Sequence, residues 1–303
     1  MPEHEPTGGP ATLASASVSA AGGRPDNQDR CGEGATGAGG RAFVVADGLG
    51  GHAAGDLAAE RAVAALLGTL AERAALAPGA LARAFGAADA AIRAAQRERP
   101  DARGCRTTAV VLALEGGRAL WGHVGDSRLY QLRAGRVAVQ TLDHSVPQAL
   151  VDVGALAPGD VRQHPDRNRL LRSLGGEESV EVALAPAPVA VLPGDAFLLC
   201  TDGFWELVSE AAMEAAFAAA SDPADWLRRM ERVLLAAARG AFDNYTATAV
   251  VVRAAAAARP TPGGLAGLVA RLRSRLRAAP GPRPGVGLHS APTPPAPLAR
   301  VAG

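Results

Sequence analysis

The sequence predicts an α+β fold in which helices and strands form separate layers. β-prone runs and helical stretches come in blocks along the chain, and no internal repeat is visible. The β-prone runs are short, and several are joined by glycine-containing turns, which is typical of antiparallel strands. We therefore expect segregated α and β layers instead of a parallel, doubly wound sheet.

The expected elements follow in chain order. Residues 32–40 are predicted to form a glycine-rich loop, and the short runs within 107–141 predict an antiparallel meander. The segment 143–176 breaks the rhythm of strands and is interpreted as an insertion. The expected strands are 12–20, 42–46, 107–114, 118–124, 128–133, 137–141, 180–184, 196–200 and 245–253. The expected helices are 56–76, 79–98, 145–153, 158–163, 210–220 and 222–239.

The composition indicates one folded domain with two appendages. With 303 residues, 48% of them hydrophobic, the chain can bury a sizeable core. We expect a flexible leader over 1–11 and the folded domain over 12–253. The sequence then becomes rich in Ala, Pro and Gly and partly basic, which predicts a mostly disordered tail over 254–303. A Leu/Arg helical stretch within 265–277 leaves contact with a membrane surface or a partner protein open.

Charge and cysteine usage exclude several classes of protein. A formal net charge of +1 argues against nucleic-acid binding. There is no long apolar run for a transmembrane segment, and the polar N-terminus lacks the layout of a secretion signal. Cys31, Cys105 and Cys200 lie far apart without a CxxC pair, so neither a zinc site nor a disulfide framework is indicated. We expect a monomer in the cytoplasm.

Acidic residues recur where predicted strands begin or end. An apolar run ends at Asp47, and glycines and a helix follow it. Asp126 and Asp202 follow later strands, Asp243 precedes the last strand, and Asp29 comes after the first. Because the end of one antiparallel strand lies beside the start of the next, these carboxylates can meet at one rim.

Such a rim of carboxylates predicts a metal centre. Clustered carboxylates resist joint ionisation, and a hard divalent cation removes that cost. All-oxygen ligands suit Mg²⁺ or Mn²⁺, and this many carboxylates favour two ions, which together activate water for phosphoester hydrolysis. Taken singly, each acid is better explained by an ordinary turn, and only the five together favour the metal centre. Arg24 is either a surface charge or a bidentate clamp for phosphate. His52, His123, His144 and His164 are interpreted as structural.

Six motifs in order resemble a known family. The chain resembles bacterial serine/threonine phosphatases of the PPM family, the PP2C type, over roughly residues 12–253. The matching stretches are RPDNQD (24–29), VADGLGGH (45–52), GDSR (125–128), TLDHS (141–145), LCTDG (199–203) and DNYT (243–246).

The resemblance implies a fold and a ligand set. The fold is a four-layer α-β-β-α sandwich of two antiparallel sheets flanked by helices. Two Mn²⁺ or Mg²⁺ ions lie in a cleft at the sheet edges, and a third is held loosely. Segment 143–176 resembles the family's mobile flap. The implied metal ligands are Asp29, Asp47 as the bridge, the Gly48 carbonyl, Asp202, Asp243 and, for the third ion, Asp126, with Arg24 binding the phosphate.

Two departures from the family pattern concern the metal and the proton donor. Gln28 stands where some relatives have Glu, which weakens one ion slightly because Gln is uncharged. Leu49 stands where eukaryotic forms carry a His proposed as the general acid. Bacterial forms commonly have an apolar residue there, so the donor is left open between water and His52.

The implied activity is hydrolysis of phosphoserine and phosphothreonine by a metal-bridging hydroxide, with both catalytic residues, Arg24 and Asp47, present. The expected partners are phosphorylated proteins and a cognate Ser/Thr kinase. Two other interpretations remain: a catalytically weak, phosphoprotein-binding scaffold, and a domain whose metal only stabilises the fold. The run Phe204-Trp205-Glu206 resembles forms associated with type VI secretion, which is a weak cue.

Overall fold

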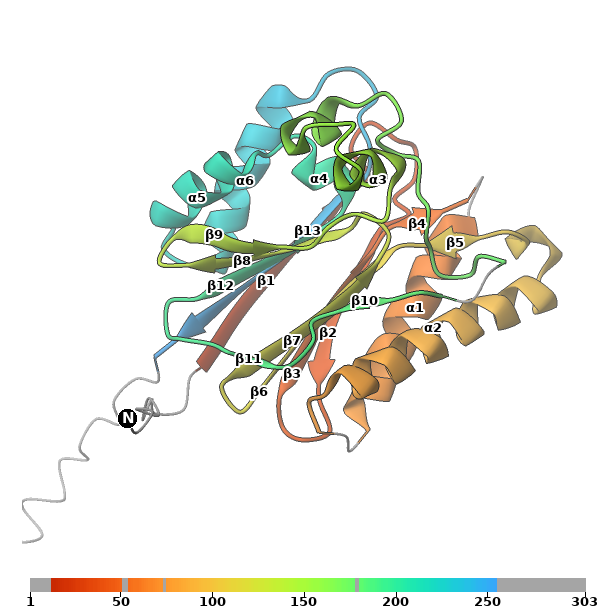
Figure 1. Ribbon diagram of the computed structural model, residues 1–303, viewed down its shortest axis with the longest axis horizontal. Coiled ribbons are helices and arrows are strands. Elements are labelled where there is room, and N and C mark those ends of the chain that lie inside the picture. The colour runs from red at the N-terminus through yellow and green to blue at the C-terminus, as the bar shows by residue number, and fades with distance from the viewer. Residues whose placement is uncertain (1–11, 51–53, 73–74, 178–179, 255–303) are drawn as a thin grey trace, which may run out of the picture. The chain divides into compact units, whose positions relative to one another are not determined.

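The computed structural model describes residues 12–50, 54–72, 75–177 and 180–254 (Figure 1). The predictions made for the leader, for the tail with its Leu/Arg stretch and for His52 lie outside these residues. No helix within the described ranges has both the length and the apolar character needed to cross a bilayer.

Two antiparallel sheets stack against each other (Figure 1). The first sheet runs in the order β1 (Thr12–Ala20), β13 (Tyr245–Arg253), β12 (Ala196–Cys200), β8 (Arg128–Arg133) and β9 (Arg136–Gln140). The second runs β10 (Ala183–Leu184), β7 (Arg118–Val124), β6 (Ala109–Glu115), β3 (Arg41–Ala46) and β2 (Arg30–Ala35), with β11 (Val189–Ala190) also on β7. A small pair, β4 (Gly48–Leu49) and β5 (Arg106–Thr107), continues from the end of β3.

Helices cover the outer face of each sheet, so the predicted four-layer α-β-β-α sandwich is confirmed (Figure 1). α1 (Ala54–Ala71) and α2 (Pro78–Glu98) pack on the second sheet. α4 (Asp202–Trp205), α5 (Glu210–Ala218) and α6 (Pro223–Ala237) pack on the first. The remaining helices are α3 (Val146–Asp152) and the 3₁₀ turns Pro100–Ala102 and Pro158–Gln163.

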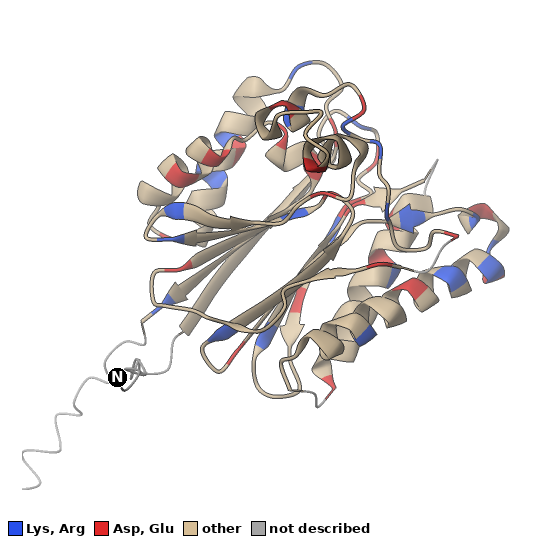
Figure 2. Cartoon of the chain, in the orientation of Figure 1, with Lys and Arg blue, Asp and Glu red and all other residues tan. Residues whose placement is uncertain are grey.

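Strand β3 shows why the layers form. Its residues alternate between the two faces of the sheet, as in any strand. Val44 packs in the cluster under α1 and α2, whereas Phe43 and Val45 pack between the two sheets. A strand buried on both faces reads as a continuous apolar run, which is what precedes Asp47. Figure 2 shows the matching charge pattern: acidic and basic residues lie mainly on helices, loops and strand ends.

The predicted meander over 107–141 is wrong as a single unit. β6 and β7 form a hairpin in the second sheet, whereas β8 and β9 form one in the first. The chain crosses between the sheets at Gly125, where φ is 97°, a conformation that favours glycine. A side chain there would also overlap Thr108. The crossing places Asp126 where the two sheets meet.

The predicted loop over 32–40 is wrong in its first part, because residues 32–35 belong to strand β2, whereas 36–40 form the turn that follows it. Gly32 lies under α1, and a Cβ there would come within 2.8 Å of Val63. Glycine in this strand therefore lets the helix approach closely. Judged from composition alone, the same glycines indicate a loop. The short elements β11 and α4 also went unpredicted, and only 183–184 of the predicted strand 180–184 is paired.

A buried ion pair holds the start of β8 to segment 143–176. Arg128 binds Asp143 through two hydrogen bonds of 2.8 and 2.7 Å, and both side chains are at least 94% buried. The guanidinium carbon lies 3.4 Å from the ring centroid of Trp205, and Arg128 also donates to the Tyr130 hydroxyl at 3.0 Å. The Trp205 indole N–H donates to the Asp126 carbonyl, so this group also fixes the crossing.

Substitution of Arg128 tests this arrangement. Arg128→Ala leaves the Asp143 carboxylate buried without its cation, and we expect a loss of about 3–5 kcal/mol in the free energy of unfolding, measured in urea. Arg136→Ala is the matched control on β9, because its pair with Glu214 is exposed and its loss should barely move the midpoint. Equal midpoints for the two variants would contradict the assignment.

Candidate metal centre

Strand register brings the acidic residues together at one rim. Arg30 and Ala46 are opposite each other in the β2–β3 pair, so the adjoining residues Asp29 and Asp47 leave the sheet side by side. In the other sheet, Asp202 follows β12 and Asp243 precedes β13, which is its neighbour. The Thr201 hydroxyl donates to Asp29 at 2.9 Å and thereby joins the rims of the two sheets.

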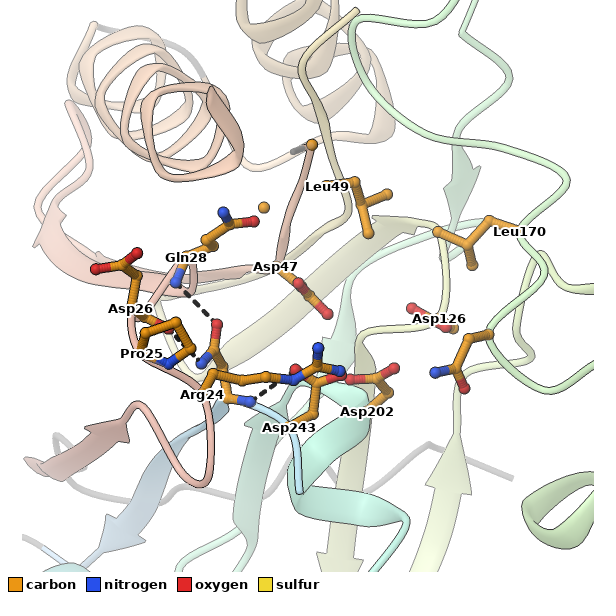
Figure 3. Close-up of a pocket in the computed structure, with 14 residues that line it drawn as sticks. Arg24, Pro25, Asp26, Gln28, Asp47, Leu49, Asp126, Leu170, Asp202 and Asp243 are labelled. Carbon is orange, nitrogen blue, oxygen red and sulfur yellow. Dashed lines mark hydrogen bonds and ion pairs between the residues drawn. The ribbon is translucent and has the colours of Figure 1, made fainter. Parts of the chain in front are cut away.

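A cleft of about 420 Å³ opens at this rim (Figure 3). Asp47, Asp126, Asp202 and Asp243 line it together with Gly48, so all but one of the predicted ligands border one space. Asp29 lies behind them and is 1% exposed. Two residues of segment 143–176, Asn168 and Leu170, also border the cleft; the family resemblance places 164–168 near the site, whereas nothing in the sequence indicates Leu170.

Burial and mutual repulsion raise the pKa values of these carboxyl groups. Burial is the main cause in each case, and the neighbouring carboxylates add to it for Asp47 and Asp126, whose pKa values lie well above their ordinary range. Burial raises the pKa of Asp29 to about 6, although Thr201 partly offsets it. Burial, with Glu206 and Asp243 nearby, raises the pKa of Asp202 to about 7. A divalent cation among these groups would favour their charged forms and displace the protons that they hold.

Two oxygens in this group have no hydrogen-bond partner among the described residues. They are Oδ1 of Asp29 and Oδ1 of Asp126, and both are buried. A buried carboxylate oxygen without a donor is costly, and a hard cation satisfies it. Within the described ranges, no group of three or more His, Cys, Asp or Glu side chains is arranged to hold a metal ion by itself. An ion here therefore needs main-chain or water oxygens as well, which Mg²⁺ and Mn²⁺ accept. The residues fit such an ion.

Gln28 is placed to support one of those main-chain oxygens. In the amide orientation that matches its neighbours, the Gln28 side-chain nitrogen donates to the carbonyl oxygens of Gly48 at 3.0 Å and Gly50 at 3.2 Å. Its backbone N–H donates to the Asn244 Oδ1. A carbonyl oxygen has two lone pairs, so the Gly48 carbonyl can still accept a cation. A side chain at Gly48 would overlap the carbonyl of Gly55, which explains the glycine. A Glu at position 28 has no amide to donate, so Gln has a role of its own here.

Arg24 lies at the same rim, paired with Asp243. The Arg24 Nη2 to Asp243 Oδ2 distance is 2.8 Å, and the two side chains are 51% and 37% exposed (Figure 3). A guanidinium has five donors in a planar fork, so this pair occupies only part of it. Arg24 is therefore placed to bind an anion in the cleft as well.

Two arginines of the flap segment attach it beside Asp202. Arg167 lies 2.7 Å from Glu206, and Arg162 lies 2.7 Å from Glu210. Glu206 follows Asp202 by four residues, the spacing that puts two side chains on one face of a helix. That spacing is the signal by which Glu206 could have been found in the sequence; the arginine partners depend on tertiary contacts.

These features define a class: a sandwich of two stacked antiparallel sheets with an acidic rim that fits divalent cations. Residues 20–237 match the family model described as Protein phosphatase 2C. The chain therefore belongs to this family, and the resemblance seen in its motifs is confirmed.

Known relatives agree with this assignment. The chain is 38% identical over 184 residues to the serine/threonine protein phosphatase PstP of Mycobacterium tuberculosis, a match covering 59% of this chain and 34% of PstP. The match thus spans about a third of that relative. A crystal structure of a PstP catalytic domain with two manganese ions is similar, with a TM-score of 0.70 and 32% identity. This match covers 80% of this chain and 100% of that structure. The structure of PppA from Pseudomonas aeruginosa, described as a key regulatory component of T6SS, is also similar, with a TM-score of 0.62 and 34% identity. This match covers 79% of this chain and 97% of that structure.

The raised pKa values predict that metal-free protein loses stability as the pH rises. The folded protein holds carboxyl protons that the unfolded chain has released above its ordinary pKa near 3.8, so stability falls as pH passes through the folded values. We expect the melting temperature in EDTA to be lower at pH 8.0 than at pH 6.5, and Mn²⁺ to raise it more at pH 8.0.

The interval starts at the ordinary His pKa of 6.5, because burial lowers the pKa values of the buried His123 and the half-buried His144, whose opposite contribution to stability falls mainly below that pH. Asp202→Asn is the comparison variant, because it cannot ionise and should flatten the dependence. A metal-free protein that is more stable at pH 8.0 than at pH 6.5 would contradict this account.

Proposed function

We propose that this chain is a divalent-metal-dependent protein phosphatase that hydrolyses phosphoserine and phosphothreonine. The observation that carries the proposal is the rim itself: five carboxylates from both sheets, two of them with unpartnered buried oxygens, beside an arginine. Membership of the family and the printed activities of the relatives support it.

Each rim residue has a proposed role. Asp47, Asp202, Asp243 and the Gly48 carbonyl, with Asp29 beside them, would hold two Mn²⁺ or Mg²⁺ ions, and Asp47 would be the ligand shared by both. Asp126 would hold a third ion. Such ions, when bound, lower the pKa of water and neutralise charge on the phosphoryl group.

Arg24 orients the phosphoryl group with two parallel N–H donors, as guanidinium geometry allows. Leu49, Leu170 and Pro25 border the same cleft and exclude water from part of it. Among the described residues that line the cleft, none is His, Lys, Cys or Tyr. The proton for the leaving alkoxide therefore comes from water or from His52, which is outside the described part.

The non-catalytic alternatives are less well supported. A phosphoprotein-binding scaffold has no need for the full ligand set, yet Asp29, Asp47, Asp126, Asp202 and Asp243 are all present. A metal that only stabilises the fold would raise the melting temperature without turnover. Phosphorylated proteins as substrates, a cognate Ser/Thr kinase, a cytoplasmic location and a monomeric state are parts of the same proposal. The similarity to PppA keeps a link to type VI secretion as a hypothesis.

Metal-dependent turnover is the direct test. Purified protein with Mn²⁺ should release phosphate from a phosphothreonine peptide and stop when EDTA is added. Asp47→Asn should lower kcat by at least about 100-fold, because the bridging carboxylate is lost. Asp101→Asn, at an exposed position far along the chain, is the matched control and should keep full activity. Undiminished turnover in EDTA or in Asp47→Asn would refute the proposal.

Arg24 has its own prediction. Arg24→Ala should lower kcat/KM for the peptide by about 10- to 100-fold, the usual cost of losing a hydrogen bond between charged groups. Arg24→Lys keeps the charge without the planar fork, so we expect it to recover only part of that loss. If Arg24→Ala matches wild type in kcat/KM, Arg24 is a surface charge paired with Asp243 and nothing more.

A further inference from the structure

A second hollow, of about 620 Å³, lies next to the catalytic cleft and is larger than it. Its lining includes Arg106, Arg172, Leu171, Ser173 and Glu177. None of these residues has a part in the mechanism proposed above.

The two hollows share their walls. Leu170 borders the catalytic cleft, whereas the next residue, Leu171, borders the second hollow. Leu49 borders the cleft, and Arg106, its partner across the β4–β5 pair, borders the second hollow. Consecutive Cα atoms lie about 3.8 Å apart and paired strands about 5 Å apart, so only one or two backbone segments separate the hollows.

The shape of the second hollow is fixed by hydrogen bonds. The Gly175 N–H donates to Asp89 at 2.7 Å, and the Gln96 amide donates to the carbonyl oxygens of Cys105 and Gly175. Thr107 and Leu174 exchange backbone hydrogen bonds of 3.1 and 2.8 Å. Because α2 and β5 hold the lining segment on both sides, the hollow is formed before any ligand arrives.

The charges favour one anionic group. Arg106 is exposed and makes no ion pair with the described residues. Arg172 lies 2.6 Å from Glu181, but the two are 40% and 73% exposed, so the pair exchanges readily for another anion. Glu177 and Glu181 both belong to the lining, so two carboxylates stand against two guanidinium groups. Arg106 is the cation of this lining without an ion pair among the described residues, so the hollow has room for one carboxylate or phosphate and disfavours a long polyanion.

We propose that the second hollow is a substrate subsite that binds an anionic side chain of the phosphoprotein, two to four residues from the phosphoresidue. Two to four residues of extended chain, at about 3.3 Å each, are enough to cross a wall about 5–10 Å thick and enter the hollow. Arg106 and Arg172 bind the anion, and Leu171, which is 58% exposed, contacts the adjoining peptide. This inference rests on the proposed phosphatase function.

Peptides of one length test the subsite. They carry phosphothreonine and, two to four positions away on either side, Ala, Asp or phosphoserine. We expect kcat/KM with Mn²⁺ at low salt to be about three- to tenfold higher for an acidic peptide than for the Ala peptide. The Asp and phosphoserine arms distinguish a carboxylate from a second phosphate as the preferred anion. Salt should reduce the preference, because the site is exposed.

Variants assign the preference to the hollow. Arg106→Ala and Arg172→Ala should bring the acidic-to-neutral ratio to about one, whereas Glu177→Gln should raise it. Arg103→Ala is the matched control, because Arg103 is exposed three residues away and borders neither hollow, so the wild-type ratio should persist. Thermal melting of each variant checks that it folds.

The outcomes separate the two proposals. Turnover of the Ala peptide without an acidic preference, or with a preference that survives Arg106→Ala and Arg172→Ala, overturns the subsite and leaves the phosphatase proposal standing. Absence of turnover for every peptide overturns the phosphatase proposal. The subsite is then decided by fluorescence anisotropy of the same labelled peptides: tighter binding of the acidic ones that depends on Arg106 supports it, and equal binding refutes it.

Discussion

The burial of several carboxylates at one rim is the constraint on which this structure depends. Asp29, Asp47, Asp126 and Asp202 all have raised pKa values, because burial and the other carboxylates disfavour their charged forms. The carboxylates are held in place by hydrogen bonds from neighbouring residues. Thr201 donates to Asp29, and Trp205 donates to the Asp126 carbonyl. The neighbouring residues, and not the acids themselves, stabilise the rim. A bound cation would balance the negative charge of the acids.

Much of the fold could be predicted because its signals are local. The strands 12–20 and 245–253 begin and end where alternation and turn residues place them, and the structure has the same bounds. The errors arise where a distant partner decides the outcome. Gly32 lies in a strand because α1 packs on it, and Gly125 separates two hairpins because each belongs to a different sheet.

The candidate site divides in the same way. The five aspartates could be singled out because strand ends recur at one rim, and the structure places four of them around the cleft. Their roles as ligands stay predictions. Arg128 with Asp143 and Arg167 with Glu206 could not be anticipated, because their partners are separated by 15 and 39 residues and joined only by tertiary packing. The second hollow has no sequence signature, since its lining comes from three separate stretches.

The pairing of β1 with β13 has a consequence for the order in which the site is completed during synthesis. Ser17 and Thr248 share a hydrogen bond across 231 positions of sequence, so β1 can pair with β13 only after the end of the domain has been synthesised. Contacts of such long range form late, because the loop must close before they contribute. Asp29 and Asp47 leave the ribosome early, yet Asp202 and Asp243 join them only when almost the whole domain has been translated. An incomplete nascent chain therefore has only part of the rim, and the complete set of carboxylates comes together only with the finished fold.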